Sequence, residues 1–268
     1  MQIISKSIDG FHKTTETQKP ILDTQRRFSG LTRLYGPQGY AKLSTTHMVI
    51  IGIGGVGSWA AECLARCGIN EITLIDMDHI AESNINRQIH ALSHTLGIAK
   101  VQAMRERIEH INPNCQVYCI EDFISSANIE KLLPKTTSVV IDCIDQLQPK
   151  VALAAWCRLH KLMHITCGAA GGKTDVSRLK VCDLSETIQD PLLAKMRSRL
   201  RKEHGFAAAG ERMQVTAVFS SEPLRNPESC DPISGLNCAG FGSAMHLTAS
   251  MGLMAAGWAI NSVVAPSP

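Results

Sequence analysis

The stretch from residue 48 to residue 76 limits the fold of this chain more than any other part. An apolar, mostly β-branched run at 48–51 ends in a G-x-G-x-x-G pattern at residues 52–57. Apolar residues at three- and four-residue spacing predict a helix over 56–67, and a second apolar run at 72–75 leads into Asp76. A strand, a glycine turn, a helix, a strand and an acid in this order are typical of a nucleotide-binding domain.

The glycines and the acid have separate physical roles. Gly52 permits a tight turn, Gly54 lets the backbone approach a phosphate, and Gly57 lets the helix pack closely on the strand. The helix N-terminus offers free N–H groups to an anion, and Asp76 can accept hydrogen bonds from a ribose hydroxyl. We therefore expect Gly52, Gly54, Gly55 and Gly57 to line a nucleotide site, with a purely structural turn as the alternative.

The run that follows Asp76 narrows the choice of nucleotide. It places polar and charged side chains at Asp78, Asn84, Arg87, Gln88 and Lys100. An NAD-dependent dehydrogenase does not need an arginine and a lysine in one pocket, whereas an enzyme that cleaves a triphosphate needs cations to offset the phosphate charge. The alternative for Arg87 and Lys100 is a solvated pair on a loop and a helix.

This run has the form D-x-D-x-I-x-x-S-N-I-x-R-Q, with a lysine after G-x-x. It resembles the ubiquitin-activating superfamily of adenylating enzymes, which includes the bacterial activators of the thiamin and molybdopterin sulfur carriers. The resemblance implies that ATP is bound, that Asp76 holds the ribose and that Asp78 is a further nucleotide-binding position. It implies contacts to the phosphates from four side chains: Asn84, Arg87, Gln88 and Lys100. It also points to Asp145 as the ligand of Mg²⁺ and to Arg87, Lys100 and Asp145 as the catalytic set.

Alternating strand and helix patterns extend over most of the chain. They predict strands at 48–51, 72–75, 117–120, 138–143, 164–167, 179–184 and 213–219, and helices at 56–67, 100–111, 124–133, 150–161 and 188–204. This order predicts an α/β fold, a Rossmann-like, doubly wound and mostly parallel sheet with a C-terminal strand-and-helix extension. We expect a flexible extension at 1–25 and a single domain at 26–268, with its nucleotide-binding core at 47–172 and a C-terminal portion at 173–268.

The composition of the chain indicates which cellular compartment and which metal sites to expect. Hydrophobic residues make up 44% of the chain but aromatic residues only 4%, which suits small aliphatic side chains packed between a parallel sheet and its helices. The ten cysteines form no C-x-x-C pair, and the polar N-terminal segment lacks an apolar core. We expect a reducing, cytoplasmic location, no signal peptide and no structural zinc.

The segment at 26–36 places cations beside apolar residues ahead of the first predicted strand. In the sulfur-carrier activators the corresponding segment reads R-Y-x-R-Q and reaches across a homodimer, where its second arginine touches the ATP of the partner. Here Arg27 matches the first arginine, but Gly30 occupies the second position, and Arg33 is the nearest substitute. The alternative is a surface helix with ordinary basic residues.

The predicted helix at 188–204 is strongly basic, with few acids to balance it. Its cations are Lys195, Arg197, Arg199, Arg201 and Lys202. Clustered cations are typical of surfaces that bind a phosphate backbone, so this helix is a candidate nucleic-acid-binding element, with a solvated helix face as the alternative. The net charge of +3 is too small to decide between them.

The last stretch, 239–265, is apolar and long enough to suggest a membrane span. Its serines, threonine, asparagine and glycines make it only mildly apolar, and no cationic flank marks an orientation. We therefore expect a buried terminal helix and no stable insertion into a membrane.

Three further segments, 27–36, 190–205 and 237–243, resemble one branch of the superfamily, the tRNA threonylcarbamoyladenosine dehydratases. The resemblance implies ATP-dependent cyclisation of threonylcarbamoyladenosine next to the tRNA anticodon, by way of an adenylated carboxylate. It also allows for a bound monovalent cation and for cysteine desulfurase and sulfur-acceptor partners. Cys238 is an accessible-looking thiol for which a structural role is the favoured alternative.

Two rival functions belong to other classes. One is an activator that adenylates the C-terminus of a ubiquitin-like sulfur carrier, and the other is a nucleotide-binding scaffold without catalytic activity. The set Asp76, Arg87, Lys100 and Asp145 argues against the scaffold.

Overall fold

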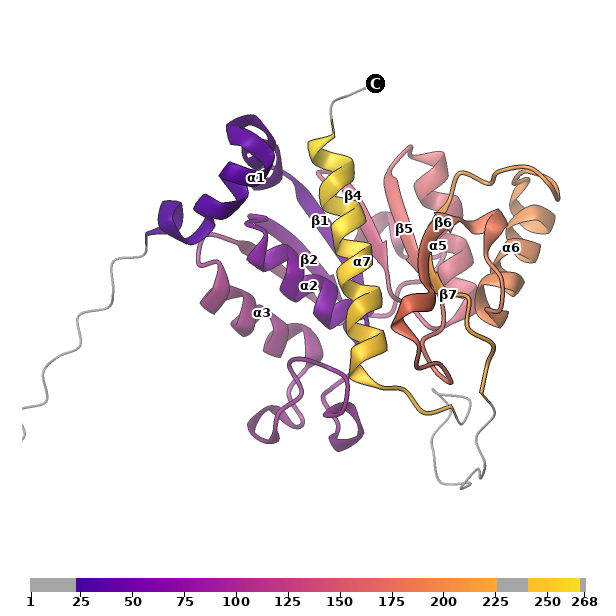
Figure 1. Ribbon diagram of the computed structural model, residues 1–268, viewed down its shortest axis with the longest axis horizontal. Coiled ribbons are helices and arrows are strands. Elements are labelled where there is room, and N and C mark those ends of the chain that lie inside the picture. The colour runs from indigo at the N-terminus through magenta and orange to yellow at the C-terminus, as the bar shows by residue number, and fades with distance from the viewer. Residues whose placement is uncertain (1–22, 226–240, 266–268) are drawn as a thin grey trace, which may run out of the picture.

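The computed structural model of the protein describes residues 23–225 and 241–265. At its centre lies a seven-stranded sheet with the order β3-β2-β1-β4-β5-β7-β6 (Figure 1). The strands are β1 (His47–Ile51), β2 (Glu71–Ile75), β3 (Gln116–Ile120), β4 (Val139–Asp142), β5 (Met163–Cys167), β6 (Leu179–Asp183) and β7 (Thr216–Ser220). Neighbouring strands are parallel except for β6 and β7, which pair antiparallel. The predicted mostly parallel α/β sheet is confirmed.

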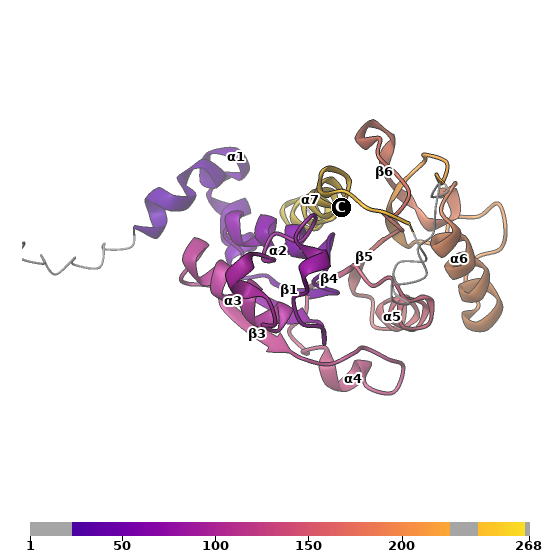
Figure 2. The ribbon, with the colours of Figure 1, turned by 90° about the horizontal axis from the view of Figure 1, so that it is seen from below.

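Helices cover both faces of the sheet, as Figure 2 shows. They are α1 (Thr24–Ser44), α2 (Gly57–Arg66), α3 (Lys100–Ile111), α4 (Ile129–Leu132), α5 (Leu147–Leu159), α6 (Pro191–His204) and α7 (Met245–Val264). On one face lie α2, α3 and α7, with α1 packed on α7, and on the other lie α4 and α5. Helix α6 packs against α5.

Strand β1 is buried on both faces of the sheet. Met48 and Ile50 join the apolar core with α2, α3 and α7, whereas Val49 and Ile51 join the core beneath α5. All of these side chains are at most 2% exposed. A continuous apolar run therefore fits a parallel strand that is covered on both faces.

Helix α7 crosses the face of the sheet and touches the start of α2 (Figure 1). A Cβ added to Gly252 would lie 2.3 Å from the backbone oxygen of Val56, so only glycine allows this approach. The helix is long and apolar enough to cross a membrane, with a mean hydropathy of 1.3, but half of that window is buried in the fold. This is the behaviour expected of a core helix.

Three elements begin at least three residues later than the sequence predicts, each for a local reason. Helix α4 begins only at Ile129, because the side chain of Asn128 accepts the N–H of Ser125 and closes a turn before it. Helix α6 begins after Asp190, which caps it, with a proline at its first position. Strand β7 begins at 216, because Gln214 has a φ of 57° and interrupts the extended backbone. Residues 1–22 and Cys238 lie outside the described residues.

Candidate active site

The candidate site lies where the connections of the sheet diverge. Strands β1 and β4 are neighbours, and the connection after β1 leads to β2 on one side whereas the connection after β4 leads to β5 on the other. In open α/β sheets such a switch point is where ligands bind, at the carboxyl ends of the strands. The glycine loop follows β1 and the turn carrying Asp145 follows β4, and both therefore stand at this point.

The glycines of the loop differ in how closely they are packed. Gly52 has a φ of 87°, and a Cβ there would lie 2.8 Å from the oxygen of Cys143, so the loop is packed against the turn after β4. A Cβ on Gly57 would lie 1.9 Å from the oxygen of Gly52. Gly54 is different, since its nearest neighbour would be an amide nitrogen 3.9 Å away. The loop is thus closed on its inner side and accessible at Gly54.

Asp76 holds the glycine loop in place. Its Oδ2 accepts the backbone N–H of Ile53 at 2.6 Å, and its Oδ1 accepts that of Asp78 at 2.8 Å. Burial raises the pKa of Asp76 above its ordinary value, although Lys100 and the two backbone N–H groups oppose that rise. Each carboxylate oxygen has a second lone pair, so Asp76 can hold the loop and still accept a ribose hydroxyl.

Lys100, at the end of the sequence motif, contacts the two aspartates at its start, Asp76 and Asp78. It stands at the first position of α3, is 6% exposed, and donates from Nζ to Asp78 Oδ2 at 2.6 Å. Asp76 Oδ1 lies 3.9 Å from the same nitrogen. The backbone N–H of Lys100 also donates to the oxygen of Asp78. An ammonium has three donors, so this pairing leaves donors for phosphate oxygens.

Arg87 and Gln88 flank the glycine loop from the other side. A Cβ on Gly55 would lie 3.2 Å from Cγ of Arg87, and the guanidinium donates to the oxygen of Ser83 at 2.6 Å. Gln88 is 5% exposed and its Nε2 is the neighbour of Gly54, while its Oε1 has no hydrogen-bond partner among the described residues. A buried, unpaired amide oxygen beside a glycine loop fits a ligand that supplies the missing donor.

Asn84 takes a structural part in the same segment. It is buried, and its Oδ1 accepts the N–H of Ala81 at 3.1 Å while its own N–H donates to the oxygen of Ala81. These bonds close the short 3₁₀ turn at Glu82–Asn84, which precedes Arg87. Asn84 therefore orients the segment that carries Arg87, whatever contact its amide makes with phosphate.

Asp145 is exposed on the turn between β4 and α5. Within the described parts of the chain, no group of three histidine, cysteine, aspartate or glutamate side chains could hold a metal ion alone. A single carboxylate nevertheless fits Mg²⁺, which usually takes one or two protein carboxylates and draws its other ligands from phosphates and water. The hard oxygen donor at Asp145 suits that arrangement.

Arg27 does not extend away from the molecule. It lies on α1 and donates from Nη1 to the backbone oxygens of His110 and Ile111, at 3.2 and 2.6 Å. These oxygens belong to the end of α3, where cations stabilise unpaired carbonyls. Arg33 is exposed on the same helix, so its predicted role across a dimer is still a prediction.

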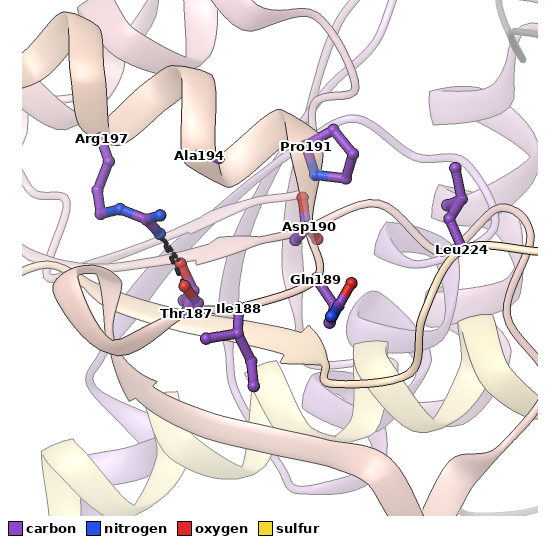
Figure 3. A pocket seen from close by; sticks show the side chains of 8 residues that line it. All are labelled: Thr187, Ile188, Gln189, Asp190, Pro191, Ala194, Arg197 and Leu224. Carbon is purple, nitrogen blue, oxygen red and sulfur yellow. Dashed lines mark hydrogen bonds between the residues drawn. The ribbon is translucent and has the colours of Figure 1, made fainter.

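One of the five α6 cations, Arg197, is half-buried and turns toward the fold. Nη1 of Arg197 donates to the backbone oxygens of Leu184 and Thr187, at 3.2 and 2.9 Å, and to the hydroxyl of Thr187 (Figure 3). Burial and then the charge of Arg201 lower the pKa of Arg197. This arginine therefore supports the loop before α6 as well as adding charge.

The other four cations also differ from one another. Arg199 pairs with Glu203 at 2.7 Å, and Arg201 donates from Nε to a backbone oxygen six residues further on. Lys195 and Lys202 are exposed. The sequence pattern groups five charges, but the helix offers only two of them to solvent without an internal partner among the described residues.

A pocket of about 170 Å³ lies beside the start of α6 (Figure 3). Its lining residues are Thr187, Ile188, Gln189, Asp190, Pro191, Ala194, Arg197 and Leu224. The carboxylate of Asp190 accepts the N–H of Ala169 at 2.9 Å, so the pocket is tied to the glycine-rich stretch after β5. The buried Lys173 also donates to the oxygens of Gln189 and Ser220. The basic helix is thus joined to the carboxyl edge of the sheet.

Two buried ion clusters near this edge were not predicted. One joins Asp142 to Lys150 at 2.8 Å, and the other places Lys173 4.0 Å from Asp190. A charged residue inside an otherwise apolar strand, such as Asp142 at the end of β4, was the available sequence signal. This signal does not identify the partner of Asp142, and Asp145, beyond the carboxyl end of the strand, is the better candidate for a ligand.

Comparison with known proteins places this geometry in a family. The model of the ThiF family matches residues 26–266. The tRNA threonylcarbamoyladenosine dehydratase of Haemophilus influenzae is 47% identical over 245 residues, which cover 90% of this chain and 94% of that protein. The enzyme of the same name from Escherichia coli is 43% identical over 253 residues, with the same coverage of both chains.

A solved structure agrees with these matches. The E. coli tRNA N6-threonylcarbamoyladenosine dehydratase in complex with ATP superposes with a TM-score of 0.83 at 44% identity, covering 91% of this chain and 96% of that one. The family match over residues 26–266 includes the sheet, the glycine loop and α6, so the resemblance noted in the sequence is confirmed. The chain belongs to the ThiF family of adenylating proteins, among relatives named tRNA threonylcarbamoyladenosine dehydratases.

Proposed function

We propose that this protein catalyses the ATP-dependent cyclisation of threonylcarbamoyladenosine in tRNA, next to the anticodon, with net loss of water. The observation that carries the proposal is the cluster of Asp76, Asp78 and Lys100 beside a glycine loop that Arg87 and Gln88 flank. The two relatives of that name, each of which is matched over 94% of its length, support the identity of the substrate.

The chemistry needs an activated carboxylate. A carboxylate oxygen of the threonyl group attacks the α-phosphorus of ATP, and pyrophosphate leaves. The carbamoyl nitrogen then attacks the acyl carbon and loses its proton, and AMP leaves with the former carboxylate oxygen. Both the nucleophile and the electrophile belong to the substrate, so the protein must orient them and stabilise charge.

Three side chains of this chain would supply that stabilisation. The ammonium of Lys100 and the guanidinium of Arg87 offset negative charge that develops on the phosphates as pyrophosphate leaves. Asp145 would hold Mg²⁺, which supplies further charge neutralisation when it is bound. Asp76 would fix the ribose, which places the α-phosphorus over the open side of the loop at Gly54.

The tRNA would lie across the basic helix. Lys195 and Lys202 are the exposed cations there, and the helix is linked through Asp190 to the carboxyl edge of the sheet. A phosphate backbone held on α6 would therefore lie beside the edge of the sheet that also carries the candidate ATP site. Arg197 and Arg201 would be less free to contact phosphates because they already donate to backbone oxygens, and the charge of Arg199 is offset by Glu203.

The remaining features of the proposal concern the assembly and its surroundings. We infer a homodimer and a cytoplasmic location. A bound monovalent cation and partners that transfer sulfur are still predictions from the family resemblance. The single-domain boundary at residue 26 is supported by the family match, which starts at that residue.

The direct test is mass spectrometry of the nucleosides of a tRNA that carries threonylcarbamoyladenosine. After incubation with the protein, ATP and Mg²⁺, the modified nucleoside should lose the mass of one water, and pyrophosphate should appear in equal amount. The Arg87→Ala protein is the matched control. An unchanged nucleoside would contradict the proposal, and pyrophosphate exchange with a sulfur carrier ending in Gly-Gly would favour the alternative activator.

A further inference from the structure

A buried ion pair lies directly beneath the turn that carries Asp145. Asp142 and Lys150 are both fully buried, and Nζ of Lys150 donates to Asp142 Oδ2 at 2.8 Å. The hydroxyl of Thr166 on β5 donates to the same oxygen at 2.7 Å and accepts from Lys150 at 2.8 Å. The three side chains join β4, β5 and α5 at the carboxyl edge of the sheet.

The second oxygen of Asp142 faces the turn instead of the core. Oδ1 accepts the backbone N–H of Ile144 at 3.0 Å. Ile144 is the residue immediately before Asp145, and the oxygen of Cys143, the residue before that, is the group against which Gly52 packs. One carboxylate is therefore fixed by Lys150 and Thr166 on one side and fixes the turn on the other.

Stability alone does not explain this arrangement. A buried ion pair loses hydration on both charges, and apolar replacements of similar volume are often as stable. The neighbouring positions of β4, from Val139 to Ile141, are entirely apolar and fully buried, so an apolar side chain would suit position 142 as far as packing is concerned. What an apolar side chain cannot supply is an acceptor for the N–H of Ile144.

We propose that Asp142 is a positioning residue for Asp145, and that Lys150 and Thr166 hold its carboxylate in the orientation that fixes the turn 143–145. The proposal rests on the proposed function, because it takes Asp145 as the magnesium ligand. Its consequence is that the preorganisation of a solvent-exposed ligand depends on a buried hydrogen-bond acceptor that does not contact the nucleotide. If the turn were loosely held, part of the free energy of Mg²⁺ binding to Asp145 would be needed to order it.

Two variants separate the hydrogen bond to the turn from the buried charge. In the Asp142→Asn/Lys150→Met protein both charges are gone, but an oxygen remains to accept the N–H of Ile144. In the Asp142→Val/Lys150→Met/Thr166→Val protein these three side chains are apolar and that oxygen is lost, while the buried His164, whose Nε2 lies 3.9 Å from Asp142 Oδ2 in the parent, is unchanged in both variants. Two readouts follow: hydrogen exchange of the Ile144 amide, and the Mg²⁺ concentration for half-maximal binding of a fluorescent ATP analogue.

The expected results differ for the two variants. The triple variant should show exchange at Ile144 at least about tenfold faster and should need at least about tenfold more Mg²⁺, with a Tm within a few degrees of the parent. The Asn/Met variant should resemble the parent in both readouts. The Asp145→Asn protein sets the size of the Mg²⁺ effect that the triple variant should approach.

Each other outcome overturns the inference. A folded triple variant with the parent Mg²⁺ midpoint would show that the cluster is only structural, and equal losses in the two variants would show that charge, not the hydrogen bond, matters. If the triple variant does not fold, a weakened Mg²⁺ response in the folded Asn/Met variant overturns the proposal and a parent-like response supports it. If the Asp145→Asn protein needed no more Mg²⁺ than the parent, Asp145 would not be the magnesium ligand and this inference would fail. If the parent bound ATP in a normal Mg²⁺-dependent way but produced no cyclised tRNA, only the proposed reaction would fail.

Arg107→Met is the control for ion-pair loss in general. Arg107 pairs with the buried Glu62 at 2.6 Å between α2 and α3, away from the turn after β4. This variant should lose stability without any change in the Mg²⁺ midpoint or in the exchange of Ile144.

Discussion

The glycine-loop region, from β1 to the start of α3, and the basic helix α6 both carry conspicuous charges, but these charges behave differently in the fold. Around the glycine loop, Asp76, Asp78 and Lys100 contact one another and the backbone within one compact site. On α6, Arg197 and Arg201 donate to backbone oxygens of the fold, and only the two lysines are exposed without an internal partner among the described residues.

The difference teaches what a sequence pattern can specify. In the first region the motif prescribes backbone geometry, through glycines and a strand end, so its polar residues must converge. On a helix, neighbouring positions point in different directions by about 100° per residue, so a run of cations is divided between the core, the backbone and solvent. Local charge alone therefore predicts an interaction surface less well than charge tied to a turn.

Arg87 and Arg197 give the largest test of this comparison, since both are half-buried arginines. Arg87→Ala should lower kcat by roughly 10²- to 10³-fold, as the loss of one donor to a developing charge does elsewhere. Its Tm should change little, because the backbone oxygen that the guanidinium contacts belongs to the exposed Ser83 and can bond to water instead. Arg197→Ala should instead lower the stability by about 1–3 kcal/mol, because backbone acceptors near Leu184 lose their partner. Nucleoside mass spectrometry and thermal unfolding measure the two effects. A normal kcat in the Arg87 variant would remove it from the mechanism.

Within the glycine loop, Gly57 and Gly54 separate packing from phosphate approach. Gly57→Ala should destabilise the protein by about 3 kcal/mol and abolish ATP binding, because its Cβ would overlap the oxygen of Gly52. Gly54→Ala should unfold like the parent but bind ATP about tenfold more weakly, a loss of about 1.4 kcal/mol. Urea titration and a fluorescent ATP analogue measure these effects. Equal behaviour of the two variants would mean that the loop is not open at Gly54.

His90 predicts an acid-sensitive element in the glycine-loop region. Its side chain is 2% exposed without a hydrogen-bond partner in the described parts of the chain, and burial, with the charges of Lys100 and Arg107, lowers its pKa from 6.5 to about 4. The folded state thus prefers the neutral ring. Its contribution to stability is complete above pH 6.5, decreases as the pH falls through this range and is lost below about 4.

Urea unfolding between pH 7 and pH 4 tests this expectation. The parent should lose roughly 2–3 kcal/mol more than the His90→Leu protein over that range, since one pKa unit corresponds to about 1.4 kcal/mol. His204→Leu is the control in the other region, because His204 is exposed at the end of α6. If the parent and the His90 variant lost stability in parallel, His90 would not be the titrating group.

The same contrast separates the features that the sequence predicts from those that it does not. The order of strands and helices and the convergence of Asp76 with Lys100 could be predicted, because hydrophobic periodicity and glycine geometry act over short distances. The Asp142–Lys150 pair could not, since residues on a strand and the following helix reveal their contact only after both have packed. The inward turn of Arg197 depends likewise on Thr187, whose position the loop before α6 determines.

The smallest effect concerns the two exposed lysines of α6. Lys195→Gln and Lys202→Gln should each weaken tRNA binding only a few-fold, but each should lower the slope of log affinity against log salt by about 1, because one counterion fewer is released. Filter binding over a range of salt concentrations measures this slope, with exposed Lys135, before β4, as the control. Arg199→Gln should change the slope less, because Glu203 already neutralises that charge. If all three α6 variants kept the parent slope, the helix would be merely solvated, and charge on this face would say nothing about where tRNA binds.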